Sequence, residues 1–177
     1  PLERAQRRKL DAILARTAAR PGEGVLEIGC GWGSFAAAAS SAGVAVHALT
    51  LSTEQRDHVA ARALPGVTVA LTDYRDVQGT FDGVASIEMV EAVGPKFWSA
   101  YLATIARVLK PGGRAALQFI TIADDIWDAY AGSVDFIQRY VFPGGSLISE
   151  RRFRALAERH GLSWQDRRAF GLDYAET

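Results

Sequence analysis

The sequence predicts a three-layer α/β sandwich built on a mainly parallel sheet. Short apolar segments, typical of buried strands, alternate along the chain with longer segments of helical periodicity. This alternation is typical of a parallel sheet with helices packed on both faces. A chain of 177 residues is long enough to bury a sizeable core, so we expect residues 1–177 to form a single domain.

Helix boundaries are expected where capping and helix-breaking residues meet the apolar periodicity. Ser52 and Gln55 form a capping box at the start of the third helix, and Pro21 helps to end the first. A Pro-Gly-Gly segment at 111–113 ends a longer helix, and Gly161 suits a left-handed stop after the last one. The expected helices span residues 2–19, 34–41, 52–63, 96–109, 125–140 and 149–160.

Strands are expected at the short apolar segments between these helices. They span residues 25–28, 44–49, 67–71, 83–87 and 114–120, with a further strand over 162–170. In parallel sheets of this kind the ligand binds at the carboxyl ends of the strands. The loops at this edge should therefore surround one site, and they span residues 29–33, 50–55, 73–76, 88–94 and 118–122.

The charge of the chain is balanced overall but uneven locally. Twenty basic and twenty acidic residues give a formal net charge of zero, which argues against a nucleic-acid-binding protein. Residues 3–20 nevertheless hold six Arg and Lys against two acids, and residues 150–168 hold six Arg against three acids. These segments are either solvated helix faces or a basic rim for an anionic surface such as phospholipid headgroups.

Cysteine usage and hydropathy indicate the compartment. The chain has one cysteine, which excludes an internal disulfide and fits a reducing compartment. No apolar run approaches the ~18 residues of a membrane span, and nothing resembles a signal peptide. We expect a cytoplasmic protein, with peripheral contact with a membrane left open.

The glycine-rich loop after the first strand distinguishes between nucleotides. A dinucleotide fingerprint needs G-x-G-x-x-G and an acid ~20 residues later, but here the spacing is G-x-G-x-G and Leu49 stands near the place of the acid. A phosphate-binding loop would need Gly-Lys-Ser/Thr, which is missing from the sequence. Glu27, just before the glycines, suits a ligand that carries an amine and little phosphate. The loop favours S-adenosylmethionine, and the alternative is a purely structural turn.

The next two loops offer contacts for the adenosine part of this cofactor. Gln55 can serve ribose hydroxyls as donor and acceptor, unless it only closes the capping box. Asp73 and Tyr74 can grip adenine by its amine and its face, unless Asp73 only forms a turn. The expected cofactor-binding residues are Glu27, Gly29, Gly31, Gly33, Thr50, Leu51, Gln55, Asp73, Tyr74 and Arg75.

Five motifs at these loops and beyond carry a family resemblance. They are 27–33 (Glu-Ile-Gly-Cys-Gly-Trp-Gly), 50–55 (Thr-Leu-Ser-Thr-Glu-Gln), 73–76 (Asp-Tyr-Arg-Asp), 86–94 (Ser-Ile-Glu-Met-Val-Glu-Ala-Val-Gly) and 140–145 (Tyr-Val-Phe-Pro-Gly-Gly). Together they resemble the cyclopropane-fatty-acyl-phospholipid synthase and mycolic acid cyclopropane synthase family. The resemblance runs from about residue 2 to residue 177. It implies the Rossmann-like fold of class I S-adenosylmethionine-dependent methyltransferases.

The resemblance also implies a reaction. A cis double bond in an unsaturated phospholipid acyl chain attacks the sulfonium methyl group, which gives a carbocation. Loss of a proton from the transferred methyl group then closes a cyclopropane ring, and the family uses a bound bicarbonate ion as the base. An outside base agrees with the histidines of this chain, because His47, His58 and His160 are not expected to reach the site.

Carried over by resemblance, the bicarbonate site consists of the Cys30 backbone, Glu91, Ile120 and Tyr174. Gln118 falls where many members have histidine. Glu91 can hold bicarbonate through its proton, and the backbone amides and Tyr174 can donate to it. Gln118 can form hydrogen bonds but cannot gain a charge, so a methyl- or methylene-branched acyl chain is an alternative product.

Three further residue assignments complete the expected site. Glu88 is a weaker candidate, because some family members have glycine there. The Cys30 thiol is not expected to be a nucleophile, since nothing near it in sequence would activate it. An acyl-chain tunnel is expected from aromatic residues, whose faces stabilise a carbocation, with core packing as the alternative: Phe136, Tyr140, Phe142 and Pro143.

The resemblance implies segments beyond both ends of this chain. Family members carry an N-terminal helical lid and a C-terminal helix and strand, so we expect a fragment of a longer protein. An unpaired sheet edge should remain, with weak or no activity in this chain and activity in its full-length parent. Alternative functions are a small-molecule N-methyltransferase and a non-catalytic cofactor-binding remnant, although Glu91 and Tyr174 argue against the latter. The oligomeric state, a homodimer included, is left open.

Overall fold

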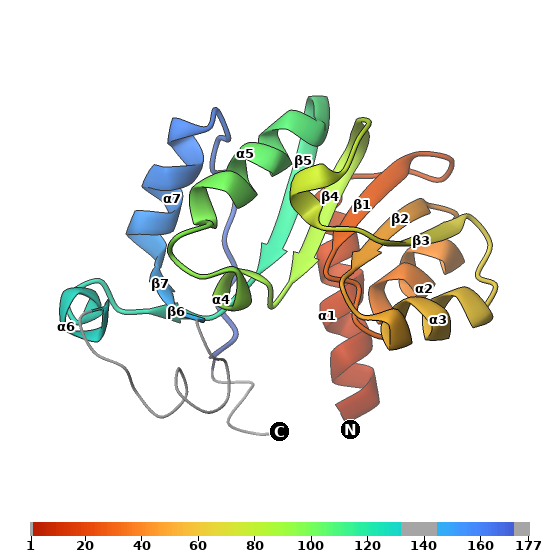
Figure 1. Ribbon diagram of the computed structural model, residues 1–177, viewed down its shortest axis with the longest axis horizontal. Coiled ribbons are helices and arrows are strands. Elements are labelled where there is room, and N and C mark those ends of the chain that lie inside the picture. The colour runs from red at the N-terminus through yellow and green to blue at the C-terminus, as the bar shows by residue number, and fades with distance from the viewer. Residues whose placement is uncertain (1, 132–144, 172–177) are drawn as a thin grey trace.

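The central element is a five-stranded, all-parallel sheet with the strand order β3-β2-β1-β4-β5 (Figure 1). The computed structural model describes residues 2–131 and 145–171. The predicted α/β fold with a mainly parallel sheet is confirmed, and four of the five predicted sheet strands agree within two residues. The strands are β1 (Gly24–Ile28), β2 (Ala45–Thr50), β3 (Val67–Leu71), β4 (Phe81–Ile87) and β5 (Leu109–Gln118).

Helices cover both faces of this sheet and bury two separate apolar clusters. On one face Phe35 and Val59 pack with Val25 and Val46 of the strands. On the other face Tyr101 and Phe153 pack with residues of β1 and β4. The first face carries α1 (Leu2–Thr17), α2 (Ser34–Ser41) and α3 (Thr53–Ala61), and the second carries α5 (Trp98–Val108) and α7 (Glu150–Arg159) (Figure 1).

The fifth strand begins earlier than its sequence predicts. The Pro-Gly-Gly segment at 111–113 was expected to separate the longer helix from the strand, yet β5 already begins at Leu109 and ends at Gln118. A Cβ at Gly113 would lie 2.8 Å from the Asp82 carbonyl oxygen. The glycine therefore lets β5 approach β4 where the register between them shifts. The helix boundary at 109 is confirmed within one residue.

Two predictions in the C-terminal third need correction or stay partial. The predicted strand over 162–170 is wrong, because these residues form no strand in the structure. Leu162 and Trp164 pack against the core, whereas Asp166 and Arg167 face solvent in ion pairs, so the segment is held by side chains and not by a strand ladder. Of the helix predicted over 125–140, the described part is α6 (Trp127–Ala131).

The sequence missed three short elements near the carboxyl edge of the sheet. They are α4 (Val90–Val93) and a separate pair of two-residue parallel strands, β6 (Thr121–Ile122) and β7 (Ile148–Ser149). A 3-10 turn, η1 (Tyr74–Asp76), follows β3. The last helix was predicted correctly, with Ser149 accepting a hydrogen bond from the Arg152 amide at its start and Gly161 at positive φ after its end.

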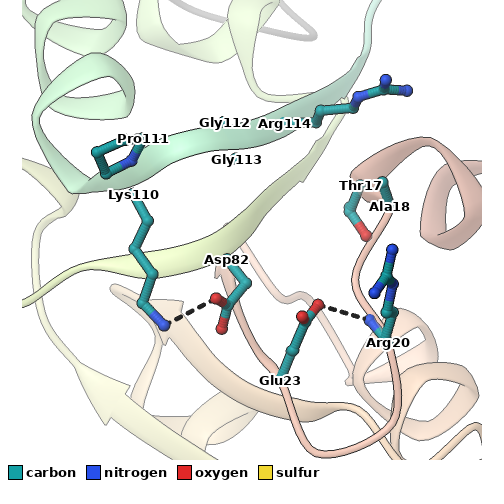
Figure 2. Close-up of a pocket in the computed structure, with 10 residues that line it drawn as sticks. All are labelled: Thr17, Ala18, Arg20, Glu23, Asp82, Lys110, Pro111, Gly112, Gly113 and Arg114. Atoms are coloured by element: carbon teal, nitrogen blue, oxygen red, sulfur yellow. Dashed lines mark hydrogen bonds and ion pairs between the residues drawn. The ribbon is translucent and has the colours of Figure 1, made fainter.

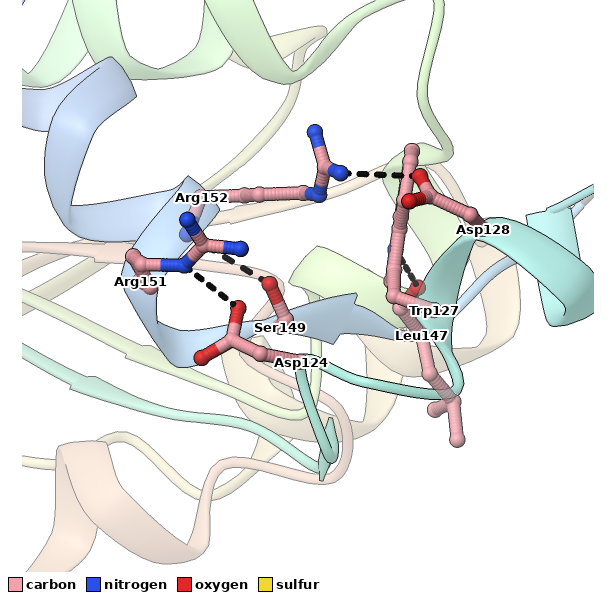
Figure 3. A network of polar contacts seen from close by, with 7 residues as sticks. All are labelled: Asp124, Trp127, Asp128, Leu147, Ser149, Arg151 and Arg152. Carbon is pink, nitrogen blue, oxygen red and sulfur yellow. Dashed lines mark hydrogen bonds and ion pairs between the residues drawn. The ribbon is translucent and has the colours of Figure 1, made fainter.

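Polar contacts fix α6 against the start of α7 (Figure 3). The Trp127 indole Nε1 donates to the Leu147 carbonyl oxygen at 3.2 Å, and the Arg152 guanidinium lies 4.1 Å from the centre of the Trp127 ring. Arg152 also pairs with Asp128 at 2.8 Å. This cation–π contact joins two segments that are far apart in sequence.

At the amino ends of the strands, one ion pair and backbone hydrogen bonds to acidic side chains join the chain segments (Figure 2). Asp82 accepts from the Gly24 amide at 2.9 Å and from Lys110 at 2.8 Å. The hydrogen bond from Gly24, together with Lys110, lowers the pKa of Asp82. This edge thus holds β1, β4 and β5 together, and the expected site lies at the opposite edge. No helix in the described part of the chain is both long and apolar enough to cross a bilayer.

Candidate active site

In the loop between β1 and α2, each of the three glycines is required for its own structural reason. All three have positive φ: 79° at Gly29, 52° at Gly31 and 79° at Gly33. A Cβ at Gly29 would lie 2.3 Å from Met89 Sδ, and one at Gly33 would lie 2.8 Å from a methyl group of Val59. A Cβ at Gly31 would meet nothing within 4 Å. The outer two glycines therefore permit close packing, and Gly31 leaves open space above the loop.

The backbone of this loop is tied to the end of β2. The amides of Gly29 and Cys30 both donate to the Leu49 carbonyl oxygen, at 3.1 and 2.9 Å. Arg62 donates to the carbonyl oxygens of Trp32 and Gly33, both at 3.0 Å. The loop is thus held in place by donors and acceptors of its own fold.

Cys30 does not offer the donor that the resemblance assigned to it. Its amide already donates to Leu49, and its thiol lies 3.6 Å from the Gly31 carbonyl oxygen. Burial, with the nearby Glu27 carboxylate, raises the pKa of the Cys30 thiol to about 11. A thiol held in this protonated form is a poor nucleophile, as expected, and we leave Cys30 out of the proposed site.

Glu27 is a buried acid in the middle strand of the sheet. The side chain is 3% exposed, and its Oε2 has no hydrogen-bond partner among the described residues. Burial raises the pKa of Glu27 to about 8, against which a hydrogen bond from the Ala36 amide acts. A buried carboxyl with one oxygen unpartnered fits a cationic or amine-bearing ligand, which would restore its charged form.

The β2–α3 loop places Gln55 by a contact that differs from the predicted capping box. The Ser52 hydroxyl accepts from the Gln55 amide at 3.1 Å, so Ser52 caps α3 as predicted. The Gln55 side chain, however, accepts from the Thr50 hydroxyl at 2.7 Å and does not close the box. Leu51, at the tip, is 72% exposed. This loop therefore presents an amide donor and an apolar side chain beside the glycine loop.

The loop after β3 favours the turn interpretation of Asp73. Its carboxylate accepts from the Arg75 backbone amide at 2.9 Å and from the Arg75 guanidinium at 2.9 and 2.7 Å. These contacts with Arg75 lower the pKa of Asp73. The Tyr74 ring packs edge-on against Tyr101 at 5.5 Å between ring centres. A contact between Asp73 and adenine would therefore have to compete with Arg75.

The two loops after β4 and β5 meet at Glu91. This side chain is 6% exposed, and its Oε1 accepts from the Ile120 amide at 2.6 Å. Its Oε2 has no hydrogen-bond partner among the described residues. Burial is the main cause that raises the pKa of Glu91, and the nearby Glu88 charge adds to it. The predicted meeting of Glu91 with Ile120 is thus present, but the Ile120 amide points at Glu91 and not at a third group.

Glu88 lies closer to this site than the sequence suggested. Its amide donates to the Gln118 carbonyl oxygen at 2.8 Å, and the Gln118 side-chain amide donates to Glu88 Oε1 at 3.3 Å. Glu88 has φ of 56°, in the left-handed region that favours glycine. Lys9 of α1 forms an ion pair with the same Glu88 oxygen at 3.7 Å. Sequence reasoning missed Lys9, because nothing local distinguishes it within a basic helix.

None of the three histidines is joined to Glu91 or Gln118 by a contact within the described residues, although His58 packs against Trp32 of the glycine loop, and five predicted site residues fall outside the described ranges. His47 lies 2.9 Å from the Thr68 hydroxyl, and His160 lies 2.9 Å from the Ser99 hydroxyl. The residues that fall outside the described ranges are Tyr174, Phe136, Tyr140, Phe142 and Pro143.

The sheet order and the glycine loop after β1 define the class of fold as that of class I S-adenosylmethionine-dependent methyltransferases. The family model described as mycolic acid cyclopropane synthetase matches residues 1–177. The chain therefore belongs to the mycolic acid cyclopropane synthetase family, in agreement with the predicted resemblance.

Two relatives with different names are equally similar in sequence to this chain. It is 40% identical to tuberculostearic acid methyltransferase UfaA1 of Mycobacterium tuberculosis and 40% identical to cyclopropane-fatty-acyl-phospholipid synthase of Escherichia coli, in both cases over 99% of this chain. The chain spans 43% and 45% of the length of these two relatives. The solved cyclopropane synthase MmaA2 of M. tuberculosis aligns with a TM-score of 0.90 and 26% identity, over 99% of this chain and 67% of that one.

Proposed function

We propose that the protein containing this chain transfers a methyl group from S-adenosylmethionine to the cis double bond of an unsaturated phospholipid acyl chain and closes a cyclopropane ring. One observation carries the proposal most of the way. At the carboxyl edge of the sheet, the buried Glu91 is held through one oxygen by the Ile120 amide and keeps its second oxygen without a partner among the described residues. A protonated or charged group can bind there.

The cofactor is assigned to the loops after β1 and β2. Gly31 leaves room for close approach of a ligand to the backbone. Glu27 supplies a buried carboxyl for the amino group of S-adenosylmethionine, and Gln55, held by Thr50, supplies a donor for the ribose. Leu51 and Tyr74 supply apolar surface for adenine. Asp73 and Arg75 form an ion pair with each other, and we assign them a structural role in the loop and not a contact with the cofactor.

The Glu91 carboxyl group fits a bound bicarbonate ion, but the contact expected from the Cys30 amide is missing. The unpartnered Glu91 oxygen and the raised pKa of Glu91 suit a carboxylic acid that donates its proton to a bound anion. The Ile120 amide would orient Glu91, and Gln118 would add a hydrogen bond. Bound there, bicarbonate would supply the base for the proton that leaves the transferred methyl group. The Cys30 amide takes no part, because Leu49 already occupies it.

A branched acyl chain is the second candidate product. Gln118 stands where many members of the family have histidine, and an amide side chain cannot accept a proton at neutral pH. The carbocation could then lose a proton from a chain carbon and leave a methyl-branched alkene. Alternatively, a 1,2-hydride shift could move the positive charge to the carbon that carries the methyl group, and loss of a methyl proton would then leave a methylene group. The chain is equally identical to a cyclopropane synthase and to tuberculostearic acid methyltransferase, so sequence identity does not favour a cyclopropane over a branched product.

The charged helices bear on how the protein reaches its lipid. Within the described residues, four of the six arginines at 150–168 are in ion pairs with acids, which supports solvated faces there: Arg151, Arg152, Arg154 and Arg167. Arg4, Arg7 and Arg8 of α1 are exposed, and no ion pair joins them to another described residue. The N-terminal end of α1 extends beyond the carboxyl edge of the sheet (Figure 1). We therefore assign the anionic lipid surface to α1.

Transfer of label tests this function directly. The full-length protein is incubated with methyl-labelled S-adenosylmethionine and vesicles of monounsaturated phospholipid, with saturated phospholipid as the matched control. We expect label in the unsaturated lipid alone. Label in neither lipid, together with methylation of a small amine, would contradict the proposal in favour of an N-methyltransferase. Cofactor binding without any transfer would indicate a non-catalytic protein.

A further inference from the structure

The first helix touches the candidate site through one side chain. Lys9, in the middle of α1, lies 3.7 Å from Glu88 Oε1, and its side chain is only about one-fifth exposed. The site is otherwise built from loops that follow strands of the sheet. Helix α1 packs on β4 and β5 through its C-terminal half, where Ile13 is buried. Lys9 is therefore placed by a rigid helix and not by a loop.

Glu88 connects Lys9 to Gln118 and Glu91, the two residues that the reaction is expected to use. It is joined to Gln118 by a backbone hydrogen bond of 2.8 Å and a side-chain hydrogen bond of 3.3 Å. It precedes Glu91 by three residues, in a loop whose left-handed backbone at Glu88 turns the chain into α4. Non-glycine residues in this backbone region cluster at active sites, where the surrounding contacts hold them in place.

We propose that Lys9 is a positioning residue of the active site, which fixes the Glu88 carboxylate against Gln118 and balances its negative charge beside Glu91. The proposal rests on the function proposed above only in assuming that Glu91 has a part in the reaction. Lys9 itself does not touch the reacting atoms. Its ammonium group holds the Glu88 carboxylate and offsets its charge.

The electrostatic consequence is specific because few charged groups face Glu91. Within the described residues they are Glu88 on the same loop, Tyr101 of α5 and, through Glu88, Lys9 of α1. The Glu88 charge disfavours the ionised form of Glu91. Lys9 offsets part of that charge. Removing Lys9 should therefore raise the pKa of Glu91, and removing the Glu88 charge should lower it.

Substitutions of Lys9 and Glu88 should therefore shift the titration midpoint of Glu91 in opposite directions. The Glu91 carboxyl is followed by carbon-13 NMR in the full-length protein with labelled glutamate, and Glu91→Gln assigns its signal. We expect Lys9→Met to move the midpoint to higher pH and Glu88→Gln to move it to lower pH, each by on the order of 0.5 pH unit. Lys9→Arg should leave the midpoint in place. In the double variant the two opposing changes should partly cancel, so its midpoint should lie between those of the single variants.

Controls separate this effect from a general loss of an ion pair. Lys110→Met breaks the ion pair with Asp82 at the opposite edge of the sheet and should not move the Glu91 midpoint. In activity assays, the high-pH limb of lipid labelling should shift in the same directions as the NMR midpoint. Shifts in the same direction for Lys9→Met and Glu88→Gln, or no shift in either, would overturn the proposal. Failure of the wild-type protein to label lipid would overturn the proposed function and leave the titration valid.

Discussion

The Ile120 backbone amide donates a 2.6 Å hydrogen bond to Oε1 of Glu91, and this contact joins the loop after β5 to the loop after β4. It fixes one oxygen of a buried acid and leaves the other at the carboxyl edge of the sheet. The described residues thus satisfy only one of the two oxygens of the buried Glu91 carboxyl group. A group that must bind a protonated or anionic partner during a reaction is expected to look like this.

Replacing Glu91 tests its chemical role without disturbing its place. Glu91→Gln keeps an oxygen that can accept from Ile120 and introduces no charge into the buried site. We expect lipid labelling to fall by about 100-fold or more, in the range for a lost general acid, with the melting temperature unchanged. Asp124→Asn, whose carboxylate pairs with the exposed Arg151 of α7, serves as the control and should retain activity. A fully active Glu91→Gln protein would remove Glu91 from the mechanism.

The glycine loop predicts two variants with different consequences. Gly33→Ala places a methyl group 2.8 Å from Val59 at a left-handed position, so we expect a clear fall in melting temperature. Gly31→Ala meets no atom within 4 Å and costs only the left-handed backbone, roughly 1–2 kcal/mol. Its main effect should be weaker binding of S-adenosylmethionine, measured by titration calorimetry. Unchanged binding by Gly31→Ala would show that the open space is not used by the cofactor.

The buried Glu27 predicts a pH dependence of stability. Its pKa is about 8 in the folded protein and 4.5 as a model carboxyl, so the folded state holds a proton that the unfolded chain loses. The contribution of Glu27 is fully present below about pH 4.5 and is lost progressively as the pH rises to about 8. Its size over this range is several kcal/mol at most.

Chemical denaturation between pH 5 and 8 measures this dependence. We expect the free energy of unfolding of the wild-type protein to fall with pH, and that of Glu27→Gln to fall much less. Saturating S-adenosylmethionine should flatten the wild-type curve, because its amino group stabilises the ionised carboxylate. Parallel curves for wild type and Glu27→Gln would contradict the assignment.

Gln118 predicts a change in product. Gln118→His places a titratable imidazole at this position, where it can accept or relay the leaving proton. We expect the ratio of cyclopropane to olefinic branched product to rise in this variant. Gln118→Asn, which keeps the amide but shortens it, should lower total labelling instead. The same product ratio in all three proteins, measured by gas chromatography of the fatty acyl esters, would show that Gln118 does not direct the proton.

The basic end of α1 predicts salt-dependent membrane binding. We expect the triple change of Arg4, Arg7 and Arg8 to Gln to weaken binding of the full-length protein to anionic vesicles by at least 10-fold, since each arginine near such a surface contributes about 1 kcal/mol. The loss should shrink at high salt. The matched control changes Arg151, Arg154 and Arg167, which already pair with acids, and should bind almost as wild type does. Equal loss in both triples would contradict the assignment of α1.

Local sequence patterns were sufficient to predict four of the five sheet strands within two residues, because alternation and capping are encoded within a few residues. Ser149 and Gly161 marked the ends of α7 correctly. The segment over 162–170 was wrongly predicted as a strand. Leu162 and Trp164 pack on the core, and Asp166 and Arg167 pair with α1 and α7. Whether such a segment pairs with a sheet depends on what lies beside it, and sequence alone does not contain that information.

The candidate site was predicted less completely than the fold. Glu91, Gln118 and Ile120 were expected together from the family resemblance, and the parallel topology predicted only that their two loops meet at one edge. The donor of each hydrogen bond was not predictable: the Cys30 amide is used by Leu49, and the Ile120 amide is used by Glu91. Lys9 could not be assigned at all, because its contact with Glu88 depends on how α1 packs across the sheet.

The number of deuterium atoms in the product tests the central claim most directly. The full-length protein is given S-adenosylmethionine with a trideuterated methyl group and a monounsaturated phospholipid, and the acyl chains are analysed by mass spectrometry and by their reactivity as olefins. The account predicts an added carbon that carries two deuterium atoms, in a chain that no longer reacts as an olefin, and loss of this product in Glu91→Gln. A product that keeps all three deuterium atoms or remains olefinic, or a lipid without label, would contradict it.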